Sequence, residues 1–495
     1  MRSAVLIAAL LLSATTARAQ LAPVFLEPGH WSWDAIRRLS AAGFAPPAAD
    51  PMDAPITVQH ARAVFTHAAD AAARAGSTDL AGLARSWLRR LDAGADSSGI
   101  LAAAAIAAGW TASSGEVLSG EGYFTGQDFT GARPLPATSG PAVTLAAHGH
   151  LTRRLSWNVH AGRLAEQWVV PAAGLGVAAG PLDLWAGRRR LHYGAGRGGA
   201  IVLGSGIDEL PSFAHRTLDT FEGIGIHVRE PFEFPWILRA LGPARVELVV
   251  GRISRNGLIE SPWVAFGRIT GSPFGDRFAL GLNRGAIFGG EGNAVTFRRL
   301  VEMVAGLHGA GFENQVFSVV MRYRPPLGSV PLEAYLEFGA DDTAGALDDV
   351  PTFIAGVDLA AVPGLPEAAF GIEHTRFSGS CCGNPLWYRS VFFRGSWSDE
   401  GRLFAHPLGG HGYEWRAHSR LDLLEDDVML RLDGFVRRRG HENLFAPERQ
   451  GYAFGSMLGV EVERGRTSLR LDGGVEWGAS WERYRIAALL SRTLH

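Results

Sequence analysis

From about residue 120 onward, apolar and polar positions alternate with a period of two. The stretch YEWRAHSRLDL shows the pattern: one face carries Tyr413, Trp415, Ala417, Ser419, Leu421 and Leu423, and the other carries Glu414, Arg416, His418, Arg420 and Asp422. Successive side chains of an extended strand point to opposite faces of a sheet. The pattern therefore predicts strands with one apolar and one charged face.

The same alternation recurs in many runs along the chain, which include 155–162, 245–250, 332–338, 428–433 and 469–477. Glycine, proline and acidic clusters such as ADDTAGALDDVP and SGSCCGNP separate them. Dividing ~375 residues by the ~20 needed for one strand and its share of turn predicts about 18 strands. That number is even, as expected of a single-chain bacterial barrel.

The N-terminal region has a helical period instead. Apolar residues recur at three-and-four spacing in 57–76 and 78–94, and a shorter run around 33–39 ends at Gly43. We expect a bundle of three or four helices, and we expect the apolar run Ile100 to Trp110 to be a buried helix. No run reaches the ~20 apolar residues of a spanning helix.

The chain begins MRSAVLIAALLLSATTARAQ, with an early Arg2, an apolar run and an Ala-Arg-Ala sequence before Gln20. These features are typical of a secretory signal peptide. The predicted domains are a signal peptide at 1–19, a periplasmic helical domain at 20–115 and an outer-membrane β-barrel at 116–495.

The alternation alone fits a soluble β-sandwich as well as a membrane barrel. In a sandwich the apolar face would pack on a second sheet and the charged face would meet water, whereas in a barrel the apolar face would meet lipid and the charged face would line the lumen. No linker divides the β region into domains, and its charged faces mix arginine with acids, as in Arg470-x-Asp472 and Arg431-x-Asp433. Such charges could pair inside a lumen. We therefore expect a transmembrane antiparallel barrel, with a soluble exported β protein as the alternative.

The composition limits the classes of partner and fold that the chain could have. The 47 Lys and Arg against 49 Asp and Glu leave no basic excess for nucleic acid. The 63 glycines, 14 tryptophans and 26 phenylalanines with only 19% charged residues favour strands and tight turns. The only cysteines, Cys381 and Cys382, are adjacent, which excludes a disulfide framework and leaves free thiols or a strained local bridge.

The layout resembles the Wzi-like capsule-assembly family of outer-membrane barrels. The resemblance is best in AGRRRLHYGAGRGGAIVLGSG at 186–206, with a second similar segment, RYRPPLGSVPLEAYLEFGADD, at 322–342. It implies a non-catalytic, lectin-like protein that holds capsular or extracellular polysaccharide at the cell surface, with the helical domain closing the periplasmic mouth of the barrel.

Two groups of residues are candidate glycan ligands. Arg188, Arg190 and His192 would share one strand face, where they could pair with acids of neighbouring strands or hold an anionic sugar through bidentate hydrogen bonds. The other group is Trp387, Tyr388 and Arg389, and Tyr413 with Trp415 is a further aromatic pair. Their rings could stack on sugars or belong to the interfacial aromatic girdle.

Other motifs point to ordinary structure. Gly194, Gly196 and Gly199 match a dinucleotide fingerprint, but a strand rather than a helix should follow, so a tight turn or bulge is expected. His406 and His411 lack further metal ligands at a suitable spacing, and we expect a glycine-rich loop. We find no nucleophile motif, and we expect no enzyme activity, cofactor or metal.

The expected function is binding and anchoring of capsular or extracellular polysaccharide by a monomer in the bacterial outer membrane, in contact with membrane lipid. Two alternatives remain open. The first is a porin-like diffusion channel on the same fold, and the second is a soluble exported glycan-binding β protein.

Overall fold

The structure is a computed structural model of the 495-residue chain. It describes residues 21–26, 30–45, 56–93, 99–114, 137–165, 167–204, 220–256, 259–304, 312–327, 330–341, 352–377, 387–390, 393, 395–399, 402–423, 427–440, 443 and 449–494. The predicted signal peptide at 1–19, Cys381 and Cys382 lie outside these residues.

One antiparallel sheet dominates the described residues, and it closes because the last strand pairs with the first, from Ala105 opposite Thr493 to Ser113 opposite Arg485. Of its 19 strands, the two-residue β7 only flanks β8, so 18 strands form the wall. The prediction of an antiparallel barrel of about 18 strands is confirmed. The wall strands are β1 (Ala103–Ser113), β2 (Thr138–Thr152), β3 (Leu155–Leu164), β4 (Gln167–Ala179), β5 (Leu182–Arg190), β6 (Thr220–Val228), β8 (Pro243–Arg252), β11 (Trp263–Gly271), β12 (Phe278–Phe288), β13 (Glu313–Tyr323), β14 (Leu332–Asp341), β15 (Thr352–Leu359), β16 (Ala368–Phe377), β21 (Gly412–Leu423), β22 (Val428–Arg439), β23 (Gly451–Arg464), β24 (Thr467–Gly478) and β25 (Glu482–Thr493).

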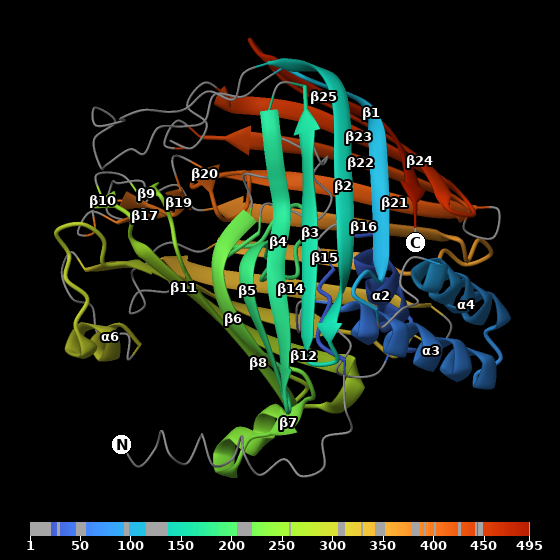
Figure 1. The fold of residues 1–495 in the computed structure, drawn as a ribbon, viewed down its shortest axis with the longest axis horizontal. Coiled ribbons are helices and arrows are strands. Elements are labelled where there is room, and N and C mark those ends of the chain that lie inside the picture. The colour runs from blue at the N-terminus through green and yellow to red at the C-terminus, as the bar shows by residue number, and fades with distance from the viewer. Residues whose placement is uncertain are drawn as a thin grey trace.

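Helices and short strands are attached to the two ends of this wall (Figure 1). The described helices are α2 (Trp31–Ala41), α3 (Val58–Arg74), α4 (Thr78–Ala93), α6 (Phe297–Val304) and the 3-10 turns η1 (Trp236–Leu241) and η2 (Gly275–Arg277). The short strands are β7 (Phe232–Glu233), β9 (Arg255–Asn256), β10 (Ile259–Glu260), β17 (Arg389–Ser390), β18 (Gly395–Ser396), β19 (Ser398–Asp399) and β20 (Arg402–Leu403). None of the helices described is long and apolar enough to cross a membrane.

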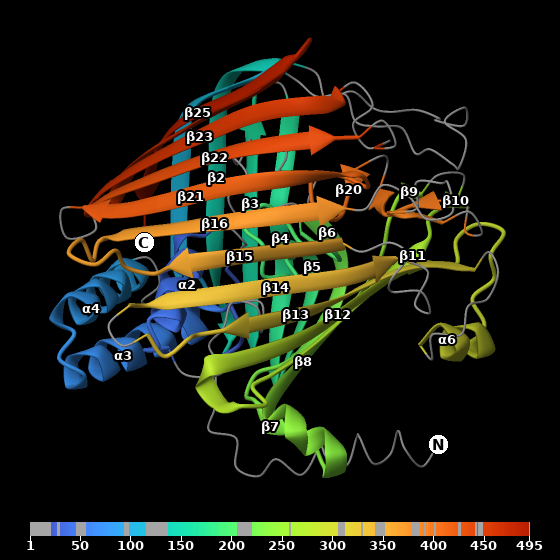
Figure 2. The same ribbon diagram turned by 180° about the vertical axis from the view of Figure 1, so that it is seen from behind.

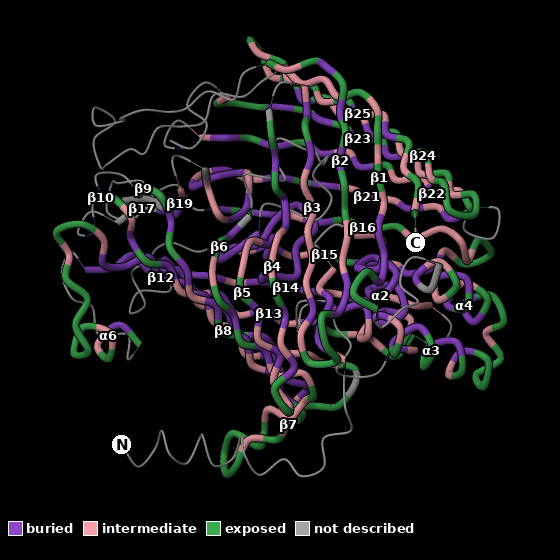
Figure 3. The backbone as a smooth tube through the Cα atoms, in the orientation of Figure 1, coloured by how far each residue is buried: buried purple, intermediate pink, exposed green. Residues whose placement is uncertain are grey.

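The two faces of the wall strands differ as the alternation predicts. On β21 all five charged or histidine side chains from Glu414 to Asp422 are buried, whereas Trp415 on the other face is half exposed. Strand β14 repeats the arrangement, with Glu333, Tyr335 and Glu337 buried. Figure 3 shows burial concentrated in the middle of the barrel and in α2. The charged face therefore points into the lumen and the apolar face points outward.

Helices α2, α3 and α4 form a small bundle at one end of the barrel (Figures 1 and 2). Trp33, Ile36 and Leu39 of α2 pack with Phe65 of α3 and Trp87 of α4 in one apolar cluster. Thr57 caps α3, because its hydroxyl accepts a hydrogen bond from the His60 backbone N–H at 3.1 Å.

The apolar run Ile100 to Trp110 is not a helix, so that prediction is wrong. Its residues from Ala103 belong to β1, the first strand of the wall, which lies before the predicted domain boundary at 116. Pairing with β2 and β25 fixes this segment as a strand. The outward positions Ile106 and Trp110 are exposed, but the inward ones are alanine and glycine, so the sequence shows no polar alternation there.

The two ends of the barrel differ in their connections. At the end that carries α2–α4, adjacent strands are joined by short turns, such as 153–154, 180–181 and 465–466. At the opposite end the β3–β4 and β24–β25 connections are also short, at 165–166 and 479–481, but most of the others are long, and the short strands β9, β10 and β17–β20 lie there, as does α6 (Figure 2).

Candidate functional site

The lumen is filled over much of its length by two inward-folded segments. We call residues 191–204 together with the described residues between 387 and 411 the lumen plug. Tyr193, Trp387 and Trp397 of the plug pack in one buried apolar cluster with wall residues such as Phe266 and Phe377. Tyr193 and Trp397 each contact the Phe266 ring edge to face, with centroids 6.4 and 6.0 Å apart.

The glycine-rich part of the plug holds a wall carboxylate. The backbone N–H groups of Arg197 and Gly198 donate to Glu373 at 2.7 and 3.0 Å, and the Tyr335 hydroxyl donates to the same carboxylate at 2.8 Å. Gly199 has φ +155°, and a Cβ there would lie 2.8 Å from His406. Only glycine fits such a close approach in this conformation.

The dinucleotide-fingerprint glycines thus build a compact turn, and no helix follows them. The turn is closed by a bridge in which the Tyr193 N–H donates to the Leu203 carbonyl at 2.7 Å. The strand expected after Gly199 does not form either, because residues 200–204 fold back inside the lumen and make this isolated bridge in place of a ladder.

Helix α2 meets the plug through a buried ion-pair network. Asp34 lies 2.6 Å from the Arg197 guanidinium, and Arg197 also approaches Asp358 of β15 at 3.6 Å. Arg37 pairs with Asp358 at 3.2 Å and donates to the Ala195 carbonyl at 3.0 Å. The network ties three parts of the molecule together: the helical bundle, the plug and the wall.

A second set of contacts fixes the same helix to β21. Arg38 pairs with Asp422, which Arg420 also contacts at 2.8 Å, and the Arg38 Nε donates to the Ala360 carbonyl at 2.9 Å. Burial would raise the pKa of Asp34, but Arg197 and Arg420 beside it hold that pKa well below its ordinary value. Asp34 is therefore ionised at neutral pH, as its partners require.

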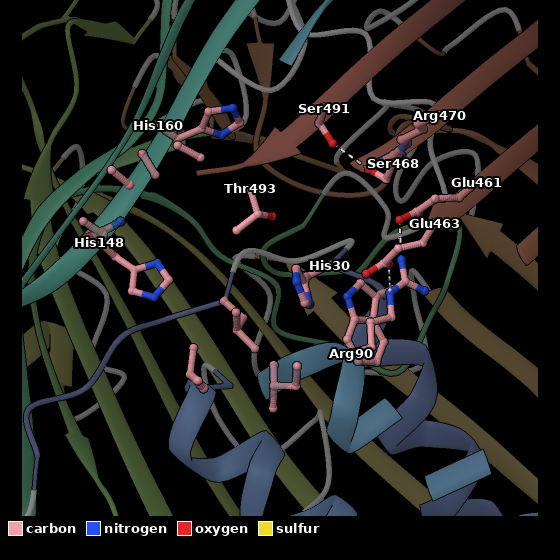
Figure 4. Close-up of a pocket in the computed structure, with 18 of the residues that line it drawn as sticks. His30, Arg90, His148, His160, Glu461, Glu463, Ser468, Arg470, Ser491 and Thr493 are labelled. Carbon is pink, nitrogen blue, oxygen red and sulfur yellow. Dashed lines mark hydrogen bonds and ion pairs between the residues drawn. The ribbon is translucent and has the colours of Figure 1, made fainter. Parts of the chain in front are cut away.

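Beside these contacts lies a cavity of about 440 Å³, bounded by the helical bundle and by strands β2–β5 and β22–β25 of the wall (Figure 4). This volume is in the range of small-molecule sites. Its polar lining is His30, Arg90, His148, Asn158, His160, Arg190, Arg431, Glu461, Glu463, Arg466, Thr467, Ser468, Arg470, Ser491 and Thr493. Five arginines against two glutamates give this lining a cationic character.

Ion pairs and hydroxyls organise the cavity. Arg90 of α4 reaches across to both Glu461 and Glu463 of β23, the second at 2.6 Å (Figure 4). The hydroxyls of Ser468 and Ser491 lie 2.5 Å apart on neighbouring strands. Arg466 is exposed in the β23–β24 turn, so the cavity opens near the end that carries the helices.

The structure separates the three basic residues predicted to share a face. Arg190 ends β5, is buried and lines the cavity. Arg188 is partly exposed and pairs with the exposed Glu222 of β6 at 3.4 Å. His192 lies beyond the strand, buried in the plug, where burial and the neighbouring Arg190 lower its pKa to about 3. His192 leaves the shared face because β5 ends at Arg190.

The aromatic candidates divide in the same way. Trp387 and Tyr388 are buried around Phe377, with ring centroids 5.4 Å from it, so they lie neither in a lipid-facing girdle nor on an outer surface. The backbone of Arg389 belongs to β17. Trp415 instead lies half exposed on the outward face, and Tyr413 beside it shares a hydroxyl contact of 2.9 Å with Tyr452.

The two histidines considered for metal binding sit in the predicted loop. His406 is buried, and its Nδ1 accepts from the Leu408 N–H at 3.1 Å. Burial lowers the pKa of this imidazole to about 3, so it is neutral at physiological pH. Within the described ranges, no three histidine, cysteine or acidic side chains cluster in a way that could hold a metal ion.

Sequence reasoning missed the residues that connect the helices to the barrel. Asp34, Arg37, Arg38 and Arg90 are charged side chains of helices with an apolar face, where solvent exposure is the usual expectation. Glu461 and Glu463 follow the period-two pattern that marked other lumenal acids. That regular spacing could have identified the acids, but no local sequence pattern identifies Arg90 of α4 as their partner.

Comparisons with known proteins agree with this architecture. The family model for capsule assembly protein Wzi matches residues 143–488, well over half of the chain. Wzi, an outer-membrane protein involved in group 1 capsule assembly in Escherichia coli and a carbohydrate-binding β-barrel, superposes with a TM-score of 0.70 at 15% identity, over 94% of this chain and 99% of that one. OpdQ of Pseudomonas aeruginosa gives a TM-score of 0.44 at 11% identity, over 80% and 99%. No curated protein sequence matches significantly.

The predictions of the Wzi-like family and of an outer-membrane barrel are confirmed: the chain belongs to the capsule assembly protein Wzi family.

Proposed function

We propose that this protein binds capsular or extracellular polysaccharide and holds it at the surface of the outer membrane, without catalysis. The observation that carries the proposal is the family match over residues 143–488. The role described for Wzi of Escherichia coli, a carbohydrate-binding barrel in capsule assembly, supports it.

The lumen plug supports this function over that of a diffusion channel. An open pore needs a continuous water-filled lumen. Here the buried cluster around Tyr193, Phe266 and Trp397 lies inside the barrel, and α2 is tied into the lumen through Asp34 and Arg37.

We also propose that the helix-bearing end faces the periplasm. Bacterial barrels have short periplasmic turns and longer extracellular loops. The short turns lie at the end that carries α2–α4, which supports a periplasmic helical unit. Most of the long connections would then lie at the extracellular end.

Within this scheme we propose the cavity as a glycan-contact site on the periplasmic side, separate from the surface that holds polysaccharide outside, with Arg190 as its ligand among the residues predicted from the sequence. A guanidinium can hold a sugar carboxylate by two parallel hydrogen bonds. Ser468, Ser491 and Thr493 would supply hydroxyl contacts beside it. Arg188, His192, Trp387 and Tyr388 would act by shaping the wall and plug.

The function is tested in a deletion strain complemented with the wild-type gene. Polysaccharide retained on cells and polysaccharide shed into the medium are measured separately. We expect the deletion to move polysaccharide from the first fraction to the second and complementation to restore it. Unchanged retention in the deletion strain contradicts the attachment role.

The site is tested with Arg190→Gln, using Arg188→Gln as the matched control because Arg188 lies outside the cavity lining. The probe is an oligogalacturonate, whose binding to the detergent-solubilised protein is measured by calorimetry. We expect Arg190→Gln to weaken binding by about tenfold, the worth of one charge-assisted contact, and Arg188→Gln to leave it unchanged. Equal effects of the two variants contradict the site.

A further inference from the structure

A segment between β12 and β13 folds back over the outside of the barrel. On β12, Gly285 and Ile287 face the lumen, where a Cβ at 285 would meet Trp397 at 2.5 Å. The alternate residues Ala286 and Phe288 face outward. There they pack with Leu300 and Met303 of α6 in a buried cluster separate from the lumenal one. Helix α6 therefore lies against the outer surface of the wall.

The contacts of Arg284 show how far α6 extends along the barrel wall from the end of β12. Arg284 also points outward, and its guanidinium donates to the Met303 and Val304 carbonyls at the end of α6, the latter at 2.9 Å. It also contacts the Gln315 amide oxygen at 2.8 Å. Arg284 lies four residues before the end of β12, which is about 10 Å along the barrel axis for a strand tilted by ~40°. The end of α6 therefore reaches below the rim of the wall.

The other face of α6 is apolar and uncovered. Phe297, Val301 and Val304, spaced as neighbours on one side of a helix, are 83%, 50% and 71% exposed. Arg298 and Arg299 lie between them along the chain and are exposed as well. Arg298 pairs with Glu302 of the same helix at 2.7 Å, and Arg299 donates to the Ala294 carbonyl at 3.2 Å. Leu300 and Met303 face the wall, and this apolar face lies beside them around the helix, where the protein does not cover it.

We propose that α6 is a lipid-binding helix in the outer leaflet, whose apolar face enters the acyl layer while Arg298 and Arg299 contact anionic lipid headgroups. An amphipathic helix with cations beside its apolar face binds an interface in this way. Continuity with the barrel argues for lipid as the occupant. The helix packs on Ala286 and Phe288 of the outward strand face, and Leu282 of the same face is 44% exposed.

The arrangement also explains a charged residue on an outward strand face. An arginine facing lipid near the middle of the bilayer costs about 2–4 kcal/mol. The α6 carbonyls and Gln315 satisfy the Arg284 guanidinium, so α6 shields it from the hydrocarbon. The site does not depend on polysaccharide binding, and either proposal can fail without the other.

The test uses the full chain with Cys381→Ser and Cys382→Ser and one new cysteine, carrying an environment-sensitive fluorophore, at Val301. Reference positions are Leu282→Cys on the outward wall and Asp79→Cys on exposed α4. The proteins are placed in nanodiscs of phosphatidylcholine, with or without equimolar phosphatidylglycerol, that carry acyl-chain quenchers.

We expect quenching at 301 to match that at 282 and to exceed that at 79. Phosphatidylglycerol should increase the quenching at 301, and Arg298→Gln with Arg299→Gln should abolish the increase. Quenching at 301 no greater than at 79 overturns the lipid site, and so does a label shielded only in a dimeric fraction, which would indicate a second copy as the occupant. Equal quenching in both lipid mixtures overturns the headgroup contact.

Discussion

Asp34 connects the helices to both the plug and the wall of the barrel. It lies between Arg197 of the plug, at 2.6 Å, and Arg420 of the wall, at 3.7 Å. Removing one member of a buried ion-pair network leaves its partners uncompensated, at a cost of about 3–5 kcal/mol. We expect Asp34→Asn to lower the thermal midpoint in detergent, and Asp79→Asn on the exposed face of α4 to leave it unchanged. Equal midpoints for both variants contradict the role of the network.

The low pKa of Asp34 predicts a pH dependence with a definite sign. The folded-state pKa lies below the ordinary value of 3.8, so the stabilisation is fully present above that value and is lost as pH falls through the folded pKa. The difference in thermal midpoint between wild type and Asp34→Asn should be constant from about pH 7 to pH 5. It should shrink only below about pH 4. A difference that disappears near neutral pH contradicts this assignment.

Local charge pairs were predictable from the sequence, but pairs between distant segments were not. Arg470 and Asp472, two residues apart on one strand face, are in contact at 2.5 Å as the alternation predicts. Arg37 and Arg38 find their acids 321 and 384 residues further along the chain. No spacing rule connects a helix to strands that far away, so only the fold reveals those pairs.

At the scale of elements, the glycine turn of the plug makes a close contact with the segment that carries His406. A side chain at Gly199 would meet both the backbone and the ring of His406, in a conformation that L residues rarely adopt. We expect Gly199→Ala to destabilise the protein by about 1–3 kcal/mol. Gly473→Ala is the matched control, because a Cβ there meets nothing within 4 Å. Denaturant unfolding in detergent measures both, and comparable losses contradict the close packing assigned to the plug.

Strand prediction succeeded where one face is polar and failed where neither is. Strand β21 places Glu414, Arg416 and His418 inward, so its type and orientation follow from the pattern. In β1 the residues of both faces are apolar or small, so its sequence pattern is equally compatible with a buried helix. The inward turn of 191–204 was missed for a related reason: its apolar residues face a lumen that the sequence suggests to be polar throughout.

For the whole molecule, the plug predicts a barrel that does not conduct. We expect wild-type protein in planar bilayers to show no steady channels. Replacement of residues 194–202 by a glycine-serine linker of equal length should produce ion currents, because it removes Ile201 and Val202 from the lumenal cluster. Heat-modifiable migration in gels confirms that the variant still forms a barrel. Steady wild-type currents, or none from a folded variant, contradict the occlusion.

The contacts of α2 also set an order of assembly. Its partners on the wall, Asp358, Ala360, Asp422 and Arg420, come from β15, the turn after it and β21, which are synthesised hundreds of residues after the helix. The bundle can pack its own apolar cluster early, but its binding site on the barrel does not exist until the second half of the wall has formed. Docking of the bundle at the end of the barrel is therefore a late step. A chain whose folding stops before β21 would carry a folded bundle next to an incomplete, open sheet.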